Sequence, residues 1–178
     1  MVALSIDGNE AATGRTGPRF AAAFAEARAA GLRCCAHAGE SSGPEGVLDA
    51  IDVLGAERID HGVRAAEDPA LVARLAAEGI PLDVCPTSNV RLGVAPSLAQ
   101  HPVEVLRRAG VRVSLNTDDP VLFESTVDGE YAACAGAFGW TTAVLADVAS
   151  TSIESCFADA GLRQDLLRDL DAYLRVTP

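Results

Sequence analysis

The chain has 178 residues, 49% of them hydrophobic, which is enough to bury a sizeable core as one domain or as part of a larger one. Its formal net charge of −11 comes from 25 acidic and 14 basic residues, and such a surface repels nucleic-acid backbones and anionic membranes. No apolar run approaches the roughly 20 residues of a bilayer-spanning helix, and the amino terminus has no signal-peptide pattern, so we expect a cytoplasmic protein without nucleic-acid or membrane partners.

Apolar β-like segments alternate with helical patterns along the first two thirds of the chain. Residues 18–30 place Phe20 and Phe24 on one helix face, and Gly31 follows as a stop. Three further helical patterns begin near a proline and end at a glycine, which is a typical pair of helix boundaries. The predicted strands cover residues 2–6, 33–37, 57–61, 80–85 and 111–116, and the three helices run from Pro44 to Gly55, Asp68 to Gly79 and Pro102 to Gly110.

The spacing of the strands indicates their arrangement. Successive strands begin about 24 to 31 residues apart, the length of a strand, a loop and a returning helix, which predicts a parallel α/β array. After Pro120 only helices are predicted, at about 126–136, 141–157 and 162–174. No linker divides the sequence, so we expect a single domain over residues 1–178 with a helical tail at about 126–178.

Polar residues gather where the predicted strands end. Parallel βα folds place function at the carboxyl ends of their strands, so these residues are expected to share one rim. They are residues 7–10 after the first strand, 37–40 after the second, His61 after the third, 85–89 (CPTSN) after the fourth and 116–120 (NTDDP) after the fifth.

Each rim residue alone also has a simple structural interpretation. His37 and His61 could be hydrogen-bonded loop histidines, and Glu40 could favour the start of a helix through the helix dipole. Asp118 and Asp119 could cap a helix that begins at the following proline. Together, however, imidazole and carboxylate side chains are the ligands of a divalent ion such as zinc, whose bound water has a pKa of about 7.

For the other reactive side chains, structural roles are the favoured interpretations. His101 precedes a proline at a predicted helix start, and we expect it to be structural. Cys85 could in principle be a nucleophile, but a proline turn that shapes the rim is the favoured interpretation of CPTSN. Arg58 and Asp60, in the third predicted strand, are expected to form ion pairs between neighbouring units; the partner of Asp83 cannot be named.

The cysteines and the absence of lysine limit the kinds of catalytic and metal sites that the chain can form. An odd number of cysteines without paired spacing indicates buried free thiols. Every basic residue is an arginine, which excludes, within this chain, a Schiff-base lysine, a P-loop lysine and a carbamylated lysine bridging two metals.

Five segments, in this order, resemble the adenosine deaminase family, which also includes adenosine monophosphate and adenine deaminases among the metal-dependent amidohydrolases. They are ALSIDGNE, HAGE, RIDHG, CPTSN and SLNTDDP, and the resemblance covers residues 2–125 well and the helical tail loosely. The paired PCxxC cysteines of other zinc deaminases are absent. Because the family fold is an eight-stranded βα barrel, the resemblance implies a partial (β/α)8 TIM-type barrel with about five parallel strands.

The resemblance also implies a reaction. It is the hydrolytic deamination of adenosine or a related 6-aminopurine to the 6-oxo product, with release of ammonia, through a zinc-bound hydroxide. His37 of HAGE and Asp118 of NTDDP resemble ligands of one Zn²⁺ or another divalent metal. Glu40 resembles the residue that protonates ring N1 as hydroxide adds to C6, which prevents negative charge from developing on the ring.

Three further positions carry implied roles. His61 is similar to the catalytic histidine that orients the attacking water and stabilises its charge. Asp119 resembles the residue that contacts this water and purine N7, and Gly8 matches the position whose backbone N–H meets N3. Adenosine, its monophosphate, adenine and larger adenine-bearing metabolites all stay open as the small-molecule substrate.

The chain departs from the family pattern in its histidines. The family's first strand carries an HxH pair that completes the zinc site, whereas this chain has only His37, His61 and His101. Two implied protein ligands are fewer than the three of most catalytic zinc sites, so we expect weak metal binding and little activity. The five strands correspond to the last five of eight, which implies the carboxyl-terminal portion of a deaminase whose open strand edges favour self-association.

Two alternatives from other classes stay open. The chain could be a catalytically silent fragment that serves as a binding or assembly piece. It could also be a metal-free barrel enzyme that uses Glu40 and Asp119 as acid and base. Upstream in-frame DNA encoding an HxH strand would favour the zinc deaminase over the fragment, and stoichiometric zinc in a full-length form would eliminate the metal-free enzyme.

Overall fold

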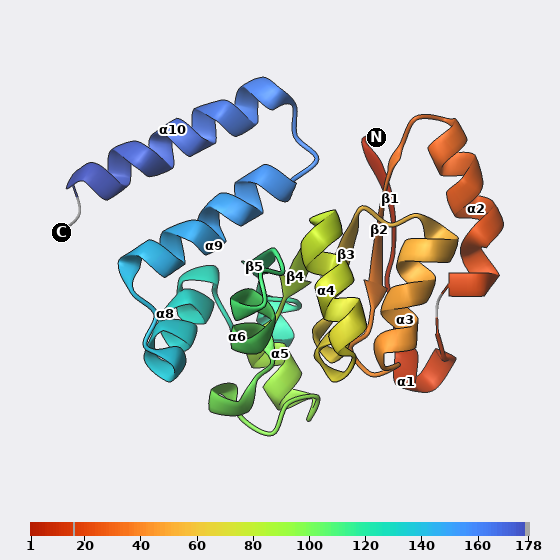
Figure 1. Cartoon of the computed structure of the whole chain (residues 1–178), viewed down its shortest axis with the longest axis horizontal. Helices are drawn as coiled ribbons and strands as arrows, with labels where there is room; N and C mark the ends of the chain where they lie inside the picture. The colour runs from red at the N-terminus through yellow and green to blue at the C-terminus, as the bar shows by residue number, and fades with distance from the viewer. Residues whose placement is uncertain (16, 177–178) are drawn as a thin grey trace.

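The computed structural model describes residues 1–15 and 17–176, and a parallel β-sheet lies at its centre (Figure 1). The five strands lie side by side in chain order, and every neighbouring pair is parallel. Ala38 is opposite His61, so the ends of two strands that carry predicted site residues are in register. The predicted α/β class with five parallel strands is confirmed. The strands are β1 (Ala3–Ile6), β2 (Arg33–Ala38), β3 (Arg58–His61), β4 (Leu82–Val84) and β5 (Val113–Leu115).

Helices return the chain between successive strands, and local signals set their bounds. Asp68 caps α4 by accepting the N–H groups of Ala70 and Leu71, and Gly79 ends the helix in the left-handed conformation at φ 68°. These helices are α1 (Glu10–Thr13), α2 (Gly17–Ala29), α3 (Pro44–Asp49) with its π-helical continuation η1 (Ala50–Leu54), η2 (Val63–Glu67), α4 (Pro69–Glu78), α5 (Pro86–Arg91), η3 (Leu98–Gln100) and α6 (Val103–Arg108).

Four of these short helices, α1, α5, η2 and η3, were not predicted. CPTSN was interpreted as a turn, but Pro86 occupies the first turn of α5, where its missing N–H costs no hydrogen bond. Helix α1 begins after Asn9, whose side chain accepts the N–H of Ala12. A single turn of helix has too little hydrophobic periodicity to be recognised from sequence.

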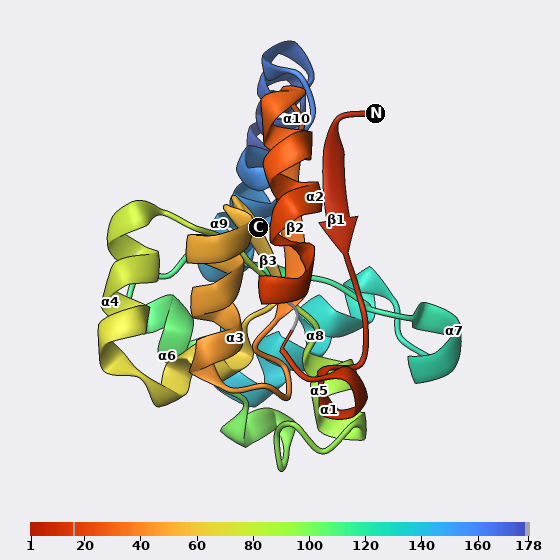
Figure 2. The ribbon, with the colours of Figure 1, turned by 90° about the vertical axis from the view of Figure 1, so that its right-hand side faces the viewer.

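One face of the sheet carries the apolar core. Figure 2 shows α3, α4 and α6 on one side of the sheet and α7 (Pro120–Phe123) on the other. The side chains between the helices and the sheet include Phe24, Leu54, Ile59 and Leu75, each at most 1% exposed. Burying side chains of this size stabilises the fold by about 1.5–3 kcal/mol each, so the helix-covered face holds the strands in place.

The opposite face of the sheet is polar. Arg58 on β3 pairs with Asp83 on β4 at 2.7 Å, and the Ser114 hydroxyl donates to Asp83 at 2.6 Å. The expected ion pair of Arg58 is therefore confirmed, and Asp83 gains its partners. Asp60 forms no ion pair within the described ranges and instead accepts a bond from the Cys35 thiol at 3.1 Å, because Arg58 reaches past it to the next strand. Burial raises the pKa of Asp83 to about 6 although Arg58 opposes the shift.

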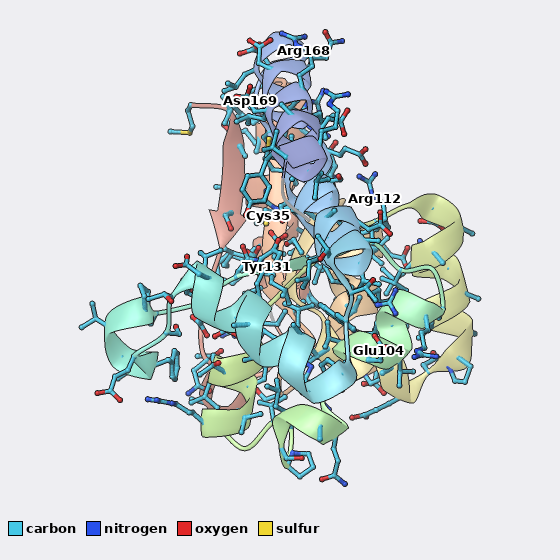
Figure 3. The ribbon with its side chains drawn as sticks, turned by 90° about the vertical axis from the view of Figure 1, so that its left-hand side faces the viewer. Cys35, Glu104, Arg112, Tyr131, Arg168 and Asp169 are labelled. Atoms are coloured by element: carbon cyan, nitrogen blue, oxygen red, sulfur yellow. The ribbon has the colours of Figure 1, made fainter. Side chains whose placement is uncertain are left out.

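The last third of the chain is helical, as predicted. It comprises α7, α8 (Val127–Phe138), α9 (Thr142–Ser155) and α10 (Ala160–Val176), and α10 packs against α9. Figure 3 shows Cys35 on the sheet and Arg168 and Asp169 on α10, which extends past the sheet. Phe157, between the last two helices, lies 4.8 Å from the guanidinium carbons of both Arg33 and Arg58. In the described part of the chain, no helix has the length and apolar character needed to cross a membrane.

Candidate active site

A cavity of about 390 Å³ opens at the carboxyl ends of the strands. Figure 2 shows α1, α5 and α7 at the end of the molecule toward which β1 runs. The cavity wall contains all six site residues predicted from the sequence: Gly8, His37, Glu40, His61, Asp118 and Asp119. The strand ends thus bring together residues that are up to 111 positions apart, while their individual roles stay predictions.

His37 has one ring nitrogen with a partner and one without. Its side chain is buried near the end of β2, and Nδ1 lies 3.1 Å from Asp7 Oδ1. Among the residues that the structure describes, Nε2 is buried without a hydrogen bond, 3.7 Å from Glu40 Oε2 and 3.8 Å from Glu10 Oε2. Buried polar atoms without a partner are rare, and an imidazole nitrogen in this state is available to a metal ion or another ligand.

Glu40 is buried and fixed through one of its two carboxylate oxygens. Oε1 accepts a hydrogen bond from Asn89 Nδ2 at 2.8 Å and lies 3.3 Å from His61 Nδ1. Oε2 faces His37. Only 8% of the residue is exposed, so a ligand in the cavity would meet a carboxylate that is already oriented.

The loop that carries Glu40 is organised by a second buried carboxylate, Glu10 of α1. Its two oxygens accept the backbone N–H groups of Gly39, Glu40, Ser41 and Ser42 and the Ser42 hydroxyl, at 2.5–3.2 Å. Burial raises the pKa of Glu10, but the hydrogen bonds from this loop outweigh burial and lower it overall. The sequence predicts Glu10 on the rim but indicates no role for it, because its partners lie 29–32 positions away.

His61 and Asp118 have strained backbones. Their φ angles are 67° and 57°, in the left-handed region that side-chain-bearing residues rarely adopt. Asp118 Oδ2 accepts the Ser88 hydroxyl at 2.5 Å and lies 4.0 Å from His61 Nε2. Strain of this kind is concentrated at functional sites, where the surrounding structure holds it in place.

The possible metal ligands form two overlapping groups. Within each group, one ligand atom from each member lies within 4.8 Å of the others. The described residues include no group of this kind that contains both His37 and Asp118, the predicted ligand pair. Both residues, together with His61, also line an adjoining cavity on the polar face of the sheet. The first group is His37, Glu40 and His61, and the second is His61, Cys85 and Asp118.

The donor atoms suit a divalent ion. His37 offers a free imidazole nitrogen and Asp118 a carboxylate, both on the wall of one cavity. Imidazole and carboxylate are common zinc ligands. The predicted ligands therefore suit a divalent ion by their chemistry and line one cavity, but their donor atoms fall into two separate groups that share only His61.

The structure also tests the simpler interpretations of individual residues. Asp119 precedes α7, yet its side chain makes no capping hydrogen bond, so the capping interpretation is wrong for this carboxylate. Cys85 is buried, and burial raises the pKa of its thiol, which disfavours a nucleophilic thiolate. The Gly8 N–H, predicted to meet purine N3, donates to Asp7 Oδ1 at 2.6 Å and would have to exchange this bond for a substrate. All five cysteines are free, as predicted, and four of them are buried, whereas Cys156 is only half-buried.

Sequence comparisons identify relatives over most of the chain. A family model described as adenosine deaminase matches residues 1–173. An aminodeoxyfutalosine deaminase of Streptomyces avermitilis is 43% identical over 173 residues, which are 97% of this chain and 48% of that protein. An adenine deaminase of Agrobacterium fabrum is 47% identical over 151 residues, 85% of this chain and 46% of that protein. The chain spans about half the length of the curated relatives it matches.

Solved structures match the fold as well. The crystal structure of adenine deaminase from Arthrobacter aurescens matches with a TM-score of 0.94 and 36% identity, covering 99% of this chain and 53% of that one. An amidohydrolase from Burkholderia ambifaria, with bound zinc, matches with a TM-score of 0.82 and 30% identity, over 96% of this chain and 50% of that one.

Proposed function

Because the chain belongs to the adenosine deaminase family, we propose that its site serves the hydrolytic deamination of a 6-aminopurine to the 6-oxo product, with release of ammonia. The observation that carries this proposal is the buried pair formed by His37, whose Nε2 has no partner, and Glu40, 3.7 Å away on the same cavity wall. Relatives described as adenine and aminodeoxyfutalosine deaminases support a purine-like substrate.

The proposed metal ligands of this chain are His37 and Asp118. A bound divalent ion would lower the pKa of a coordinated water to about 7 and so make a nucleophile available at neutral pH. Zinc is the proposed ion, supported by the relative from Burkholderia ambifaria with bound zinc.

Glu40 is proposed to supply the proton for ring N1. When hydroxide adds to C6, the electrons of the C6–N1 double bond move to N1, and a proton delivered there keeps the ring neutral. The Oε2 atom is suited to this role because Asn89 holds the other oxygen. His61 is proposed to orient the attacking water, and Asp119 to contact that water and purine N7.

The cavity wall also contains groups that could hold a flat ring. Leu92, Val94 and Phe123 line the cavity beside the polar cluster, and apolar side chains of this kind exclude water from a bound heterocycle. The Gly8 N–H is proposed to bind purine N3 after it leaves Asp7. These contacts recognise the purine ring itself, and therefore adenine, adenosine and larger adenine-bearing molecules share them.

A nuclear magnetic resonance titration of the purified chain tests the site directly. Adenine added in the presence of zinc is expected to shift the resonances of Gly8, Glu40 and His61, because the ring would lie against them. Arg168→Ala, far out on α10, serves as a control variant and should give the same shifts. Shifts confined to residues outside the cavity, or no shifts at saturating adenine, would contradict the proposed function.

A turnover assay tests the extent of activity. With two proposed protein ligands, fewer than the three of most catalytic zinc sites, the 178-residue chain should release little ammonia from adenine or adenosine. Steady, zinc-dependent release that disappears in Glu40→Gln would overturn the proposed low activity while supporting the role of Glu40. Binding of adenine without turnover would support the proposed purine site and count against deamination by this chain.

A further inference from the structure

Two buried polar residues stand behind Glu40, outside the cavity wall. Asn89, on α5, is fully buried, and its Nδ2 donates to Glu40 Oε1 at 2.8 Å. Its Oδ1 lies 3.1 Å from Nε2 of His101, which is 2% exposed. The three side chains form a continuous path from the loop before α6 to the carboxylate proposed to protonate the substrate.

A backbone group determines the direction of these hydrogen bonds. The N–H of Val103 donates to His101 Nδ1 at 3.1 Å, so Nδ1 carries no proton and the neutral ring has its proton on Nε2. Nε2 therefore donates to Asn89 Oδ1. Burial lowers the pKa of His101 to about 4, which agrees with a neutral ring at pH 7.

This direction matters because an asparagine amide can flip. An amide rotated by half a turn would present Oδ1 to the Glu40 carboxylate, and two acceptors would then face each other without a proton. Because His101 Nε2 donates, the Asn89 amide is satisfied in only one orientation, with Oδ1 toward the histidine and Nδ2 toward Glu40. The backbone carbonyl of Asn89 is also held, because it accepts the N–H groups of Val94 and Ala95 at 2.8 and 3.1 Å.

We propose that His101 is a positioning residue for Glu40, acting through the amide of Asn89. It holds the amide so that Glu40 Oε1 is bound and Oε2 stays directed into the cavity. The link to catalysis rests on the proposed function, in which Glu40 is the proton donor, whereas the hydrogen-bond path does not. His101 thus has a role beyond the structural one that the sequence suggested from its place before a helix.

A matched pair of substitutions distinguishes the proposed positioning of Asn89 from a purely structural role of His101 at the start of α6. In His101→Asn, the side-chain oxygen occupies the position of Nδ1 and can still accept the Val103 N–H, but the donor to Asn89 is lost. In His101→Gln, the amide nitrogen occupies the position of Nε2 and can still donate to Asn89, but the acceptor for Val103 is lost. If His101 served only to begin α6, His101→Asn would be the harmless variant.

The first readout is hydrogen exchange of the Asn89 side-chain amide, followed by nuclear magnetic resonance in the 178-residue chain without metal or substrate. Loss of one hydrogen bond to the amide in His101→Asn should speed this exchange about tenfold, and His101→Gln should stay within about threefold of wild type. Long-range nitrogen–proton spectra of wild type should show the His101 proton on Nε2. The opposite tautomer, or equal protection of Asn89 in both variants, would overturn the proposal.

The second readout is ammonia release from adenine with zinc, normalised to folded protein. Where wild type has measurable turnover, His101→Asn should lower kcat about 10- to 100-fold with little change in KM, the usual effect of losing a partner that orients an active-site residue, and His101→Gln should recover most of it. A larger loss in His101→Gln than in His101→Asn would contradict the positioning role. Absent turnover in every protein would count against the deaminase activity alone, because the exchange measurement still decides the hydrogen-bond path.

Discussion

The two loops that carry the proposed proton donor and the second proposed metal ligand are built in opposite ways. The loop after β2, which contains Glu40, is buried or half-buried, and the Glu10 carboxylate binds every residue from Gly39 to Ser42. The loop after β5, which contains Asp118 and Asp119, is exposed, and its main side-chain tie is the Ser88 hydroxyl.

The first loop is preorganised, whereas the second loop is strained. Glu40 has its orientation before any ligand arrives, since Asn89 and its own backbone are both fixed. Asp118 has a left-handed backbone and a carboxylate open to solvent on one side. Ligand binding should therefore change the loop after β5 more than the loop after β2.

The largest expected effect comes from removing the carboxylate that organises the first loop. Glu10→Ala leaves four backbone N–H groups of the loop without their acceptor, and at about 1 kcal/mol each the free energy of unfolding should fall by about 4 kcal/mol. Urea denaturation measures this loss. The free energy of unfolding of Glu10→Gln, which keeps one acceptor oxygen, should lie between those of the wild type and Glu10→Ala. A loss below 1 kcal/mol in Glu10→Ala would mean that the loop does not depend on Glu10.

The next effect concerns the glycine that precedes Glu40. Gly39 has a φ of 68°, and an added Cβ would overlap the buried Val47 Cγ2. Gly39→Ala should therefore lower the free energy of unfolding by about 3 kcal/mol, from backbone strain and overpacking together. Gly93→Ala is the matched control, because Gly93 has a φ of 74° with open space around it and should lose only about 1 kcal/mol. Equal losses in the two variants would show that the first loop is not tightly packed.

The smallest effect tests strain in the second loop. Because Asp118 has a φ of 57°, Asp118→Gly should be more stable than Asp118→Ala by about 1 kcal/mol. At the neighbouring Asp119, with a φ of −89°, the order should reverse. Thermal unfolding of the four variants measures both differences. If Asp118→Ala proved as stable as Asp118→Gly, the left-handed backbone would not be strained.

The sequence predicted the fold because its signals are local. Hydrophobic periodicity, together with glycine and proline boundaries, located all five strands and the long helices within a few residues. Parallel strands then force their carboxyl ends to one rim, which is why the six predicted site residues meet at one cavity. That convergence follows from topology and needs no knowledge of side-chain contacts.

Contacts between distant segments could not be predicted in the same way. Glu10 and Asn89 are ordinary polar residues in the sequence. Glu10 acquires its role through partners 29 or more positions away, and Asn89 through Glu40, 49 positions away, and His101, 12 positions away. The single-turn helix α1 has too few residues for a periodic signal. The left-handed backbones of His61 and Asp118 could not be predicted either, because in a sequence only glycine indicates that conformation.

Zinc titration of the metal-free chain tests most directly the claim that His37 and Asp118 serve one ion beside Glu40. We expect one weakly bound zinc, whose affinity falls about tenfold or more in both His37→Ala and Asp118→Ala. Cys85→Ser should bind zinc as the wild type does, because its thiol is not a proposed ligand. Unchanged affinity in His37→Ala, with losses in Asp118→Ala and Cys85→Ser, would place the ion in the other ligand group and contradict the account.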